Sequence, residues 1–473
     1  MITPPPAFDE MTLNGEIRPG YEAVAQWLQG LSLEELRRKK AEAEAVFRRI
    51  GITFAVYGEG GDPERLIPFD LVPRVFSGAE WDIIDRGVKQ RAKALNLFIH
   101  DVYNARESIK AGVAPAHIIE SNDAYQPLME GFTPPQGVYT HVVGIDIVRT
   151  GPEEFFVLED NCRTPSGVSY VLENRAIMTR LFPELFASGN IRPVDGYPEL
   201  LRQTLAECAP PACKGTPSIV VLTPGHFNSA YYEHSFIADE MGVHLVEGSD
   251  LFVEDGLVYM RTTTGPERVD VIYRRLDDAF LDPEAFNPDS MLGVPGLMNA
   301  YLTGGVTLVN APGAGIADDK AIYCYIPDLI RFFLNEEPLL PNVQTYRCGE
   351  PDQLAYALDH IDELVFKEVH GSGGYGMLIG PAATRKEKRS YAKKVMADPK
   401  AFIAQPTLAL STSPTFVDKG VAPRHIDFRP FALVGTKVRL TPGGLTRVAM
   451  RQNSLVVNSS QGGGVKDTWV LVK

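Results

Sequence analysis

The sequence predicts a mixed α/β (α+β) fold with more than one domain. Its 473 residues exceed the usual size of a single domain and contain enough apolar residues for a large core. Short apolar segments alternate with helical segments between residues 217 and 310, a pattern typical of a small parallel sheet. Strands of antiparallel type recur toward the carboxyl terminus, whereas the amino-terminal region has helical patterns.

The amino-terminal region, residues 1–130, is predicted to be mainly helical. Ser32 and Glu35, three residues later, form a capping box ahead of a helical pattern that ends at Ile50. A second amphipathic pattern predicts a helix from about residue 78 to residue 106.

Residues 131–195 are predicted to contain a hairpin whose oxygen-bearing side chains converge on one face. The runs His141–Arg149 and Phe155–Asn161 are rich in Val, Ile and Phe and are separated by turn residues. A register centred on this turn puts Asp146 opposite Glu159, and Asn161 shares the face of Glu159 because strand side chains alternate. This all-oxygen set suits Mg²⁺, which takes its other ligands from phosphates and water. A structural ion pair at the hairpin end is the alternative.

Residues 216–312 are predicted to form a Rossmann-like α/β domain. One helical pattern, residues 229–241, alternates with strand patterns at residues 218–223, 244–246, 269–273 and 306–310. Arg274 and Arg275 follow the third strand, where they are candidates to bind an acceptor carboxylate in a bidentate fork. Structural pairs with Asp277 and Asp278 explain the two arginines equally well.

Residues 313–473 carry features that together suit a bound nucleotide. Lys320 is expected in the first turn of a helix running to residue 333, where a cation opposes the helix dipole and therefore implies an anionic partner. Lys367 lies on a predicted strand, residues 364–369, ahead of a loop whose glycines let backbone N–H groups approach phosphates. Gln405 ends an apolar strand and is a candidate to meet an adenine edge. Each feature alone also fits an exposed lysine, a flexible loop or a plain strand end.

Two positively charged residues nearer the carboxyl terminus are further candidates for the functional site. Arg429 ends an alternating pattern that turns it, Asp427 and His425 to one face, with a surface row of salt bridges as the alternative. Lys466 follows three glycines in the segment Asn458–Asp467, which is predicted to be a flap or a phosphate-contacting loop. A short strand is also predicted at residues 455–458.

Composition excludes several other classes of function. A net charge of −14 and a pI near 5.2 argue against non-specific binding to nucleic acid or to an anionic membrane. Five cysteines without paired spacing indicate buried free thiols in a reducing cytoplasm. The first residues resemble no secretion signal, and no apolar run approaches the length of a membrane span.

Taken together, these parts resemble a known family. The segments that carry the resemblance are QRAKALNLFIHDVY, VLEDNCRTPSGVSYVLENR, VIYRRLDD, ADDK, DFRPF and NSSQGGGVKDTWV. They are similar to bacterial circularly permuted ATP-grasp proteins related to glutathionylspermidine synthetase, in which the metal segment precedes the lysines and the glycine loop. The resemblance implies a circularly permuted ATP-grasp fold with a helical amino-terminal region and an inserted small parallel-sheet domain of the pre-ATP-grasp type.

The resemblance also implies roles for individual residues. It implies that the Mg²⁺ ligands are Asp146, Glu159 and Asn161, that the ATP ligands are Lys320, Lys367, Gly371, Ser372, Gly373, Gly374 and Gln405, and that the catalytic residues include Arg163, Arg429 and Lys466. One departure concerns Gly144, because glutathionylspermidine synthetase has an arginine two residues before its metal aspartate. Arg149 or Arg163 is expected to take the place of that arginine.

The implied activity is that of a carboxylate–amine ligase that uses ATP and Mg²⁺. A substrate carboxylate, from a small molecule or a peptide, would form an acylphosphate that an amine then captures. Bacterial relatives often accompany a helical protein, so a helical partner is expected as well. Two alternatives remain at this point: an ATP-binding scaffold with little turnover, and phosphoryl transfer to a group other than a carboxylate.

Overall fold

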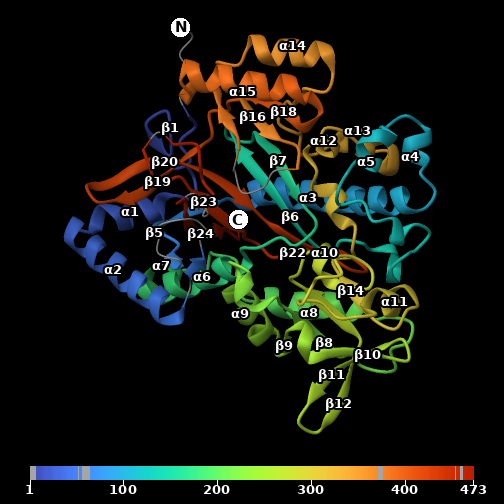
Figure 1. Cartoon of the computed structure of the whole chain (residues 1–473). Coiled ribbons are helices and arrows are strands. Elements are labelled where there is room, and N and C mark those ends of the chain that lie inside the picture. Colours follow the sequence, from blue (N-terminus) through green and yellow to red (C-terminus); the bar gives the residue numbers. More distant parts are fainter. Residues whose placement is uncertain are drawn as a thin grey trace.

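The fold is described from a computed structural model, which covers residues 7–51, 53–55, 64–370, 376–452, 454–458 and 462–472. In these residues the largest sheet has nine strands, and they come from three distant parts of the chain (Figure 1). In spatial order they are β22 (Val438–Leu440), β21 (Phe431–Val434), β6 (Val142–Arg149), β20 (Gly420–Arg429), β23 (Leu445–Val448), β24 (Gly464–Val470) and β5 (Phe69–Phe76), with β7 (Phe155–Asn161) paired to β6 and β19 (Thr412–Val417) paired to β20.

Helices cover both faces of this nine-stranded sheet. On one face, apolar side chains of α3 pack in the same core as Val143, Ile145 and Ile147 of β6. On the other face, α2 and α6 share a core with β5 and β24. The helices of this part of the chain are α1 (Glu22–Gly30), α2 (Leu33–Ile50), α3 (Gly78–Tyr103), α4 (Glu107–Lys110), α5 (Ala116–Glu120), α6 (Val168–Leu181), α7 (Pro183–Phe186) and α8 (Tyr197–Glu207).

Capping explains where the two longest of these helices begin. The predicted box of Ser32 with Glu35 starts α2, and a second box of Ser77 with Glu80 starts α3. The expectation of a mainly helical amino-terminal region misses β5, which forms the edge of the large sheet and runs parallel to β24. Pro73 sits inside β5, and an edge strand tolerates this missing donor.

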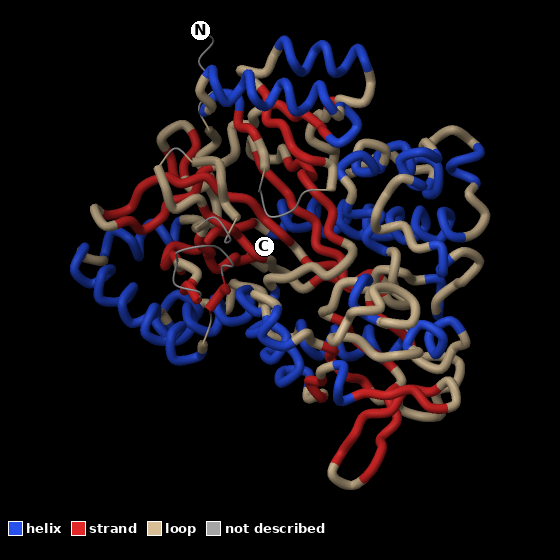
Figure 2. The backbone as a smooth tube through the Cα atoms, in the orientation of Figure 1, coloured by secondary structure: helices blue, strands red, loops and turns tan. Residues whose placement is uncertain are grey.

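The predicted Rossmann-like domain is present as a small parallel sheet. Its strands lie in the order β14 (Thr307–Val309), β13 (Val271–Arg274), β8 (Ile219–Leu222) and β9 (His244–Val246), and its helices are α9 (Tyr231–Met241), α10 (Asp278–Leu281) and α11 (Leu297–Leu302). A three-stranded antiparallel sheet, β10 (Leu251–Glu254), β11 (Leu257–Thr262) and β12 (Gly265–Val269), projects from it at the bottom of Figure 2.

A third unit lies at the opposite end of the molecule, at the top of Figure 1. It is an antiparallel sheet of β15 (Tyr346–Arg347), β18 (Phe402–Pro406), β16 (Leu364–Glu368) and β17 (Leu378–Ile379), covered by α14 (Pro351–Asp359) and α15 (Arg385–Ala397). Residues 313–473 are therefore divided between two sheets, because β19 to β24 return to the sheet of the hairpin. Two short antiparallel pairs complete the described strands: β1 (Thr12–Leu13) with β2 (Glu16–Ile17), and β3 (Thr53–Ala55) with β4 (Glu64–Leu66).

Two local expectations are wrong. The single helix predicted from Lys320 is two helices, α12 (Lys320–Tyr323) and α13 (Ile326–Leu334). Pro327 lies in the first turn of α13, where its ring disfavours a helix continuing from the preceding residues. Residues 455–458 form no strand but an irregular segment. In the described part of the chain, no helix combines the length and apolarity needed to cross a membrane.

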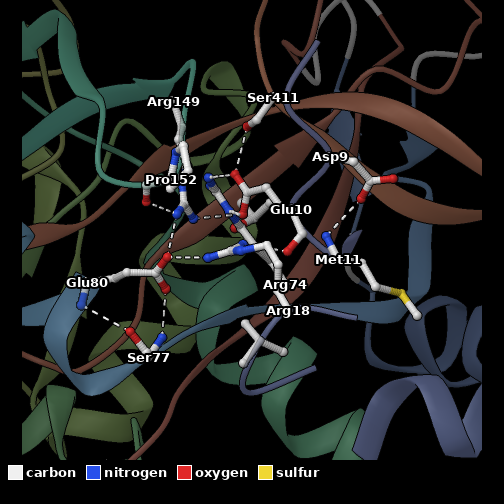
Figure 3. Close-up of polar contacts among 12 residues, drawn as sticks. Asp9, Glu10, Met11, Arg18, Arg74, Ser77, Glu80, Arg149, Pro152 and Ser411 are labelled. Atoms are coloured by element: carbon white, nitrogen blue, oxygen red, sulfur yellow. Dashed lines mark hydrogen bonds and ion pairs between the residues drawn. The ribbon is translucent and has the colours of Figure 1, made fainter. Parts of the chain in front are cut away.

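A buried ionic cluster joins Glu10 and Arg18 to the large sheet (Figure 3). Glu10 is fully buried and accepts hydrogen bonds from Arg74 Nε at 2.8 Å and from Ser411 Oγ at 2.7 Å. Arg149 Nη1 lies 3.6 Å from Glu10 Oε2, and Arg149 and Arg18 both pair with Glu80. Burial alone would raise the pKa of Glu10, but Arg74 and Arg149 lower it to about 2.

Glu10→Gln is expected to destabilise the fold by about 3 kcal/mol at pH 7, because it leaves the buried guanidinium group of Arg74 without its counter-charge. The stabilisation from Glu10 is present above its ordinary pKa of 4.5 and is lost as the pH falls through about 2. Urea unfolding of wild type and variant should therefore differ most near neutral pH and converge in acid. The exposed Glu16 provides the matched control, Glu16→Gln. Equal midpoints for Glu10→Gln and wild type at pH 7 would contradict this account.

Candidate functional site

A cavity of about 480 Å³ opens between the hairpin, the antiparallel sheet at the top of Figure 1 and the start of α9. Segments far apart in the sequence contribute side chains to it. The residues proposed from the sequence that line it are Asp146, Glu159, Asn161, Lys320, Lys367, Gln405 and Arg429. Acidic and amide groups from the hairpin thus share one cavity with the lysines that lie about two hundred residues later.

The hairpin has the register expected from the sequence. Asp146 pairs with Glu159, and Asn161 pairs with Gly144. Since Ile145 and Ile147 point into the core with α3, strand alternation directs Asp146 to the other face, toward the cavity. Asn161 Nδ2 donates to the carbonyl oxygen of Gly144 at 3.3 Å, which leaves its amide oxygen for another partner.

The two lysines approach this face from different elements. Asp319 caps α12 by accepting the N–H of Ala321 at 2.7 Å, so Lys320 begins the helix. Its Nζ lies 3.9 Å from Glu159 Oε1. Lys367 reaches the cavity from β16 and donates to Gln405 Oε1 at 2.8 Å.

The charge of Lys367 depends on its surroundings. Burial lowers the pKa of Lys367 to about 8, and the nearby charge of Lys320 acts in the same direction. Glu159 and Asp146 act in the opposite direction but do not cancel the effect of burial. A buried amine of this kind gains charge stability from any anion placed beside it.

Two arginines hold Asp146 from the neighbouring strands. Arg429 of β20 and Arg447 of β23 each place Nη2 at 2.8 Å from Asp146 Oδ2. Arg447 Nε also donates to Asp427 Oδ1 at 2.9 Å. Burial opposes ionisation of Asp146, yet the two arginines keep its pKa at about 2. Arg447 was not proposed from the sequence. A charged residue within the apolar run LTRVAM was the available signal.

Arg429 also resolves the departure at Gly144. A Cβ at Gly144 would lie 3.2 Å from Arg429 Cδ and 3.1 Å from Pro165 Cβ, so these side chains fill the space over the glycine. The guanidinium beside the aspartate therefore comes from β20. The expectation that Arg149 or Arg163 takes this place is wrong. Arg149 lies in the Glu10 cluster, and Arg163 is 42% exposed and pairs with Asp277 at 3.5 Å.

The comparisons with known proteins identify the family of this chain. Residues 73–449 match the family model described as circularly permuted ATP-grasp type 2. This chain belongs to the circularly permuted ATP-grasp family. A glutathione synthetase-like effector from Globodera pallida has a similar fold, with a TM-score of 0.61 at 11% identity over 93% of this chain and 98% of the effector.

Proteins with similar sequences occur in several bacteria. An uncharacterized protein of Synechocystis is 51% identical over 97% of this chain and 95% of its own length. One from Mycobacterium tuberculosis is 50% identical over 98% of this chain and 84% of its own length. A putative glutamate–cysteine ligase of Frankia alni is 40% identical over 98% of this chain, which spans only 54% of that protein.

Two residues predicted to be catalytic in this ATP-grasp site, Lys466 and Arg163, lie outside the cavity. Lys466 belongs to β24, is buried beside Asp70 and donates to the carbonyl oxygens of Val72 at 2.9 Å and Pro414 at 2.7 Å. The structure therefore corrects its predicted catalytic role to a structural one, because a strand rather than a loop carries it. Arg163 is likewise absent from the described lining.

Two further arginines, Arg274 at the end of β13 and Arg275 directly after it, are also structural in this ATP-grasp fold. Arg274 is fully buried, pairs with Asp278 at 2.6 Å and donates to the carbonyl oxygen of Asn310 at 2.6 Å. Arg275 donates to the carbonyl oxygen of Pro165 at 2.9 Å, so it supports the turn that lines the cavity. Neither presents the free fork predicted to bind a substrate carboxylate.

The glycine loop of the ATP-grasp pattern cannot be placed. Gly371, Ser372, Gly373 and Gly374 lie outside the described residues. On either side of them, Glu368 and Met377 line the cavity.

The oxygen donors of the hairpin fit a hard cation. In the described part of the chain, no group of three His, Cys, Asp or Glu side chains is arranged to hold a metal ion. A site for Mg²⁺ would therefore combine Glu159, Asp146 and the amide oxygen of Asn161 with phosphate oxygens and water. Glu159 is the more accessible of the two carboxylates, with 26% of its side chain exposed against 3% for Asp146.

Proposed function

We propose that this ATP-grasp protein is an ATP- and Mg²⁺-dependent ligase that joins a carboxylate to an amine. The observation that carries the proposal is the shared cavity, in which the carboxylate and amide side chains of the hairpin face Lys320 and Lys367. Family membership and the relative from Frankia named as a putative glutamate–cysteine ligase support the same class of reaction.

The residues divide between binding and charge neutralisation. Lys320 and Lys367 would hold the phosphates of ATP, and Gln405, hydrogen-bonded to Lys367, would border the adenine. Asp146, Glu159 and Asn161 would hold Mg²⁺, which neutralises the phosphate charge when it is bound. Arg429 and Arg447 lie beside this group and would stabilise the negative charge on the phosphoryl group in transfer.

The reaction proceeds in two balanced steps. A substrate carboxylate oxygen attacks the γ-phosphorus, the bond to the β-phosphate oxygen breaks, and ADP leaves. An amine nitrogen then attacks the carbonyl carbon of the acylphosphate, the C–O bond breaks, and phosphate leaves with a proton from the nitrogen. The protein contributes mainly by positioning the reactants and by electrostatic stabilisation.

Purified protein should release ADP in a Mg²⁺-dependent manner from a panel that combines carboxylates, amino acids and amines. Product mass spectrometry would identify the new amide bond. A protein that binds ATP but releases no ADP with any pair would favour the scaffold alternative. ADP release with a phosphorylated alcohol or histidine as product would favour phosphoryl transfer to another group.

A further inference from the structure

One end of the cavity lies away from the lysines. It is lined by the turn of residues 164–167, Tyr170, residues 228–230 and Glu233. In Figure 1, α9, which carries Glu233, and the strands β16 and β18, which carry Lys367 and Gln405, lie on opposite sides of the hairpin. The phosphoryl group in transfer would meet its substrates between these ends, so the α9 end is the place for the second substrate.

A single carboxylate supplies the charge at the surface of this end, and a buried arginine pairs with it from behind. Among the described residues that line it, Glu233 is the only one with a formal charge. Arg275 lies behind the lining, buried, and its Nη1 donates to the carbonyl oxygen of Pro165 at 2.9 Å and to Tyr273 at 3.1 Å. Arg429 and Arg447 border the same region but are held by Asp146 and Asp427. Arg275 Nε has no hydrogen-bond partner, but it is buried, so a carboxylate at this end would find no accessible cation among the described residues that is not already engaged.

Glu233 has one oxygen engaged and one with spare capacity. Its side chain is 4% exposed. Oε2 accepts from the N–H of Gly167 at 2.7 Å, from the N–H of Ser169 at 3.1 Å and from Ser169 Oγ at 2.9 Å. The nearest charged partner of Oε1 is Arg275 Nη2 at 3.6 Å, which is beyond hydrogen-bond distance. A buried carboxylate oxygen with unused acceptor capacity, at the wall of a cavity, is a strong site for an ammonium group.

We propose that this end of the cavity binds the amine acceptor, that Glu233 holds its ammonium group, and that the acceptor is a primary amine without a carboxylate on the same carbon. The inference rests on the proposed ligase function and names the class of its second substrate. An α-amino acid would place its carboxylate close to Glu233 with no free cation, whereas an amine or an amino-acid amide avoids this repulsion.

Binding of three matched probes tests the inference without turnover. The probes are n-propylamine, L-2-aminobutanoate, which adds a carboxylate beside the amine, and L-2-aminobutanamide, which neutralises that carboxylate. Each is titrated at pH 7 into the protein with Mg²⁺ and a non-hydrolysable ATP analogue, and binding is followed by ligand-observed NMR. We expect n-propylamine to bind at least ten times more tightly than L-2-aminobutanoate, and the amide to recover most of that difference. Equal or tighter binding of L-2-aminobutanoate overturns the inference.

Glu233→Gln should weaken n-propylamine binding at least tenfold and leave the affinity for the ATP analogue unchanged. Glu240→Gln, an exposed position on the same helix, should change neither. Unchanged n-propylamine binding in Glu233→Gln overturns the role of Glu233.

Because Glu233 also supports residues 167 and 169, a second variant leaves it intact. Ser229→Lys adds a cation at the same end and should reverse the preference, so that L-2-aminobutanoate binds more tightly than n-propylamine. A variant that keeps the wild-type preference counts against the inference. Selective amine binding without ADP release from any pair would instead refute the ligase while leaving the amine site in place.

Discussion

Glu159→Gln is expected to lower ATP turnover by at least about 100-fold while leaving the fold intact. Glu159 faces Asp146 across the hairpin and is the more accessible carboxylate of the proposed metal set. The substitution keeps the size of the side chain and removes one negative charge, so a divalent cation and its bound phosphates lose a principal ligand. Loss of Mg²⁺-dependent ADP release with an unchanged thermal midpoint is the expected pair of measurements.

Glu153→Gln provides the control for this prediction. Glu153 is exposed in the turn of the same hairpin, and the same chemical change there should leave ADP release at the wild-type rate. Raising the Mg²⁺ concentration should partly restore turnover in Glu159→Gln, because the defect lies in metal affinity. Wild-type turnover in Glu159→Gln at low Mg²⁺ would refute the metal assignment.

The hairpin was predictable because its information is local. Apolar alternation fixes which side chains share a face, and a short turn fixes the register. The pairing of Asp146 with Glu159 follows from these two facts alone. The capping box at Ser32 and the short strand His244–Val246 could be predicted for the same reason.

The partners of these residues depend on pairing between distant strands. Arg429 and Arg447 meet Asp146 because β20 lies between β6 and β23, and no spacing within either segment reveals that order. Lys466 was misassigned for the same reason. Its neighbouring glycines favour a loop, but pairing with β5 and β23 makes the segment a strand and buries the lysine against Asp70. The family resemblance supplied the convergence of the lysines with the hairpin, which periodicity could not.

Lys367→Met is expected to weaken ATP binding by more than about 100-fold, since it removes a buried charge beside the proposed phosphates. A methionine of similar length suits this half-buried position on β16, so the fold should be retained. Titration of a fluorescent ATP analogue measures the loss. Lys393→Met, at an exposed position of α15, is the matched control and should bind as wild type does.

The pH dependence of binding separates a direct charge contact from a packing effect at Lys367. Burial lowers its pKa to about 8 in the nucleotide-free protein, so its charge is lost as the pH rises through that value. Affinity for ATP should therefore fall between pH 7 and pH 9.5. In Lys367→Arg the guanidinium stays charged across this range, and the fall should be much smaller even if the affinity at pH 7 is lower. An identical decline in wild type and Lys367→Arg would place the titrating group elsewhere in the site and would remove Lys367 from contact with the phosphates.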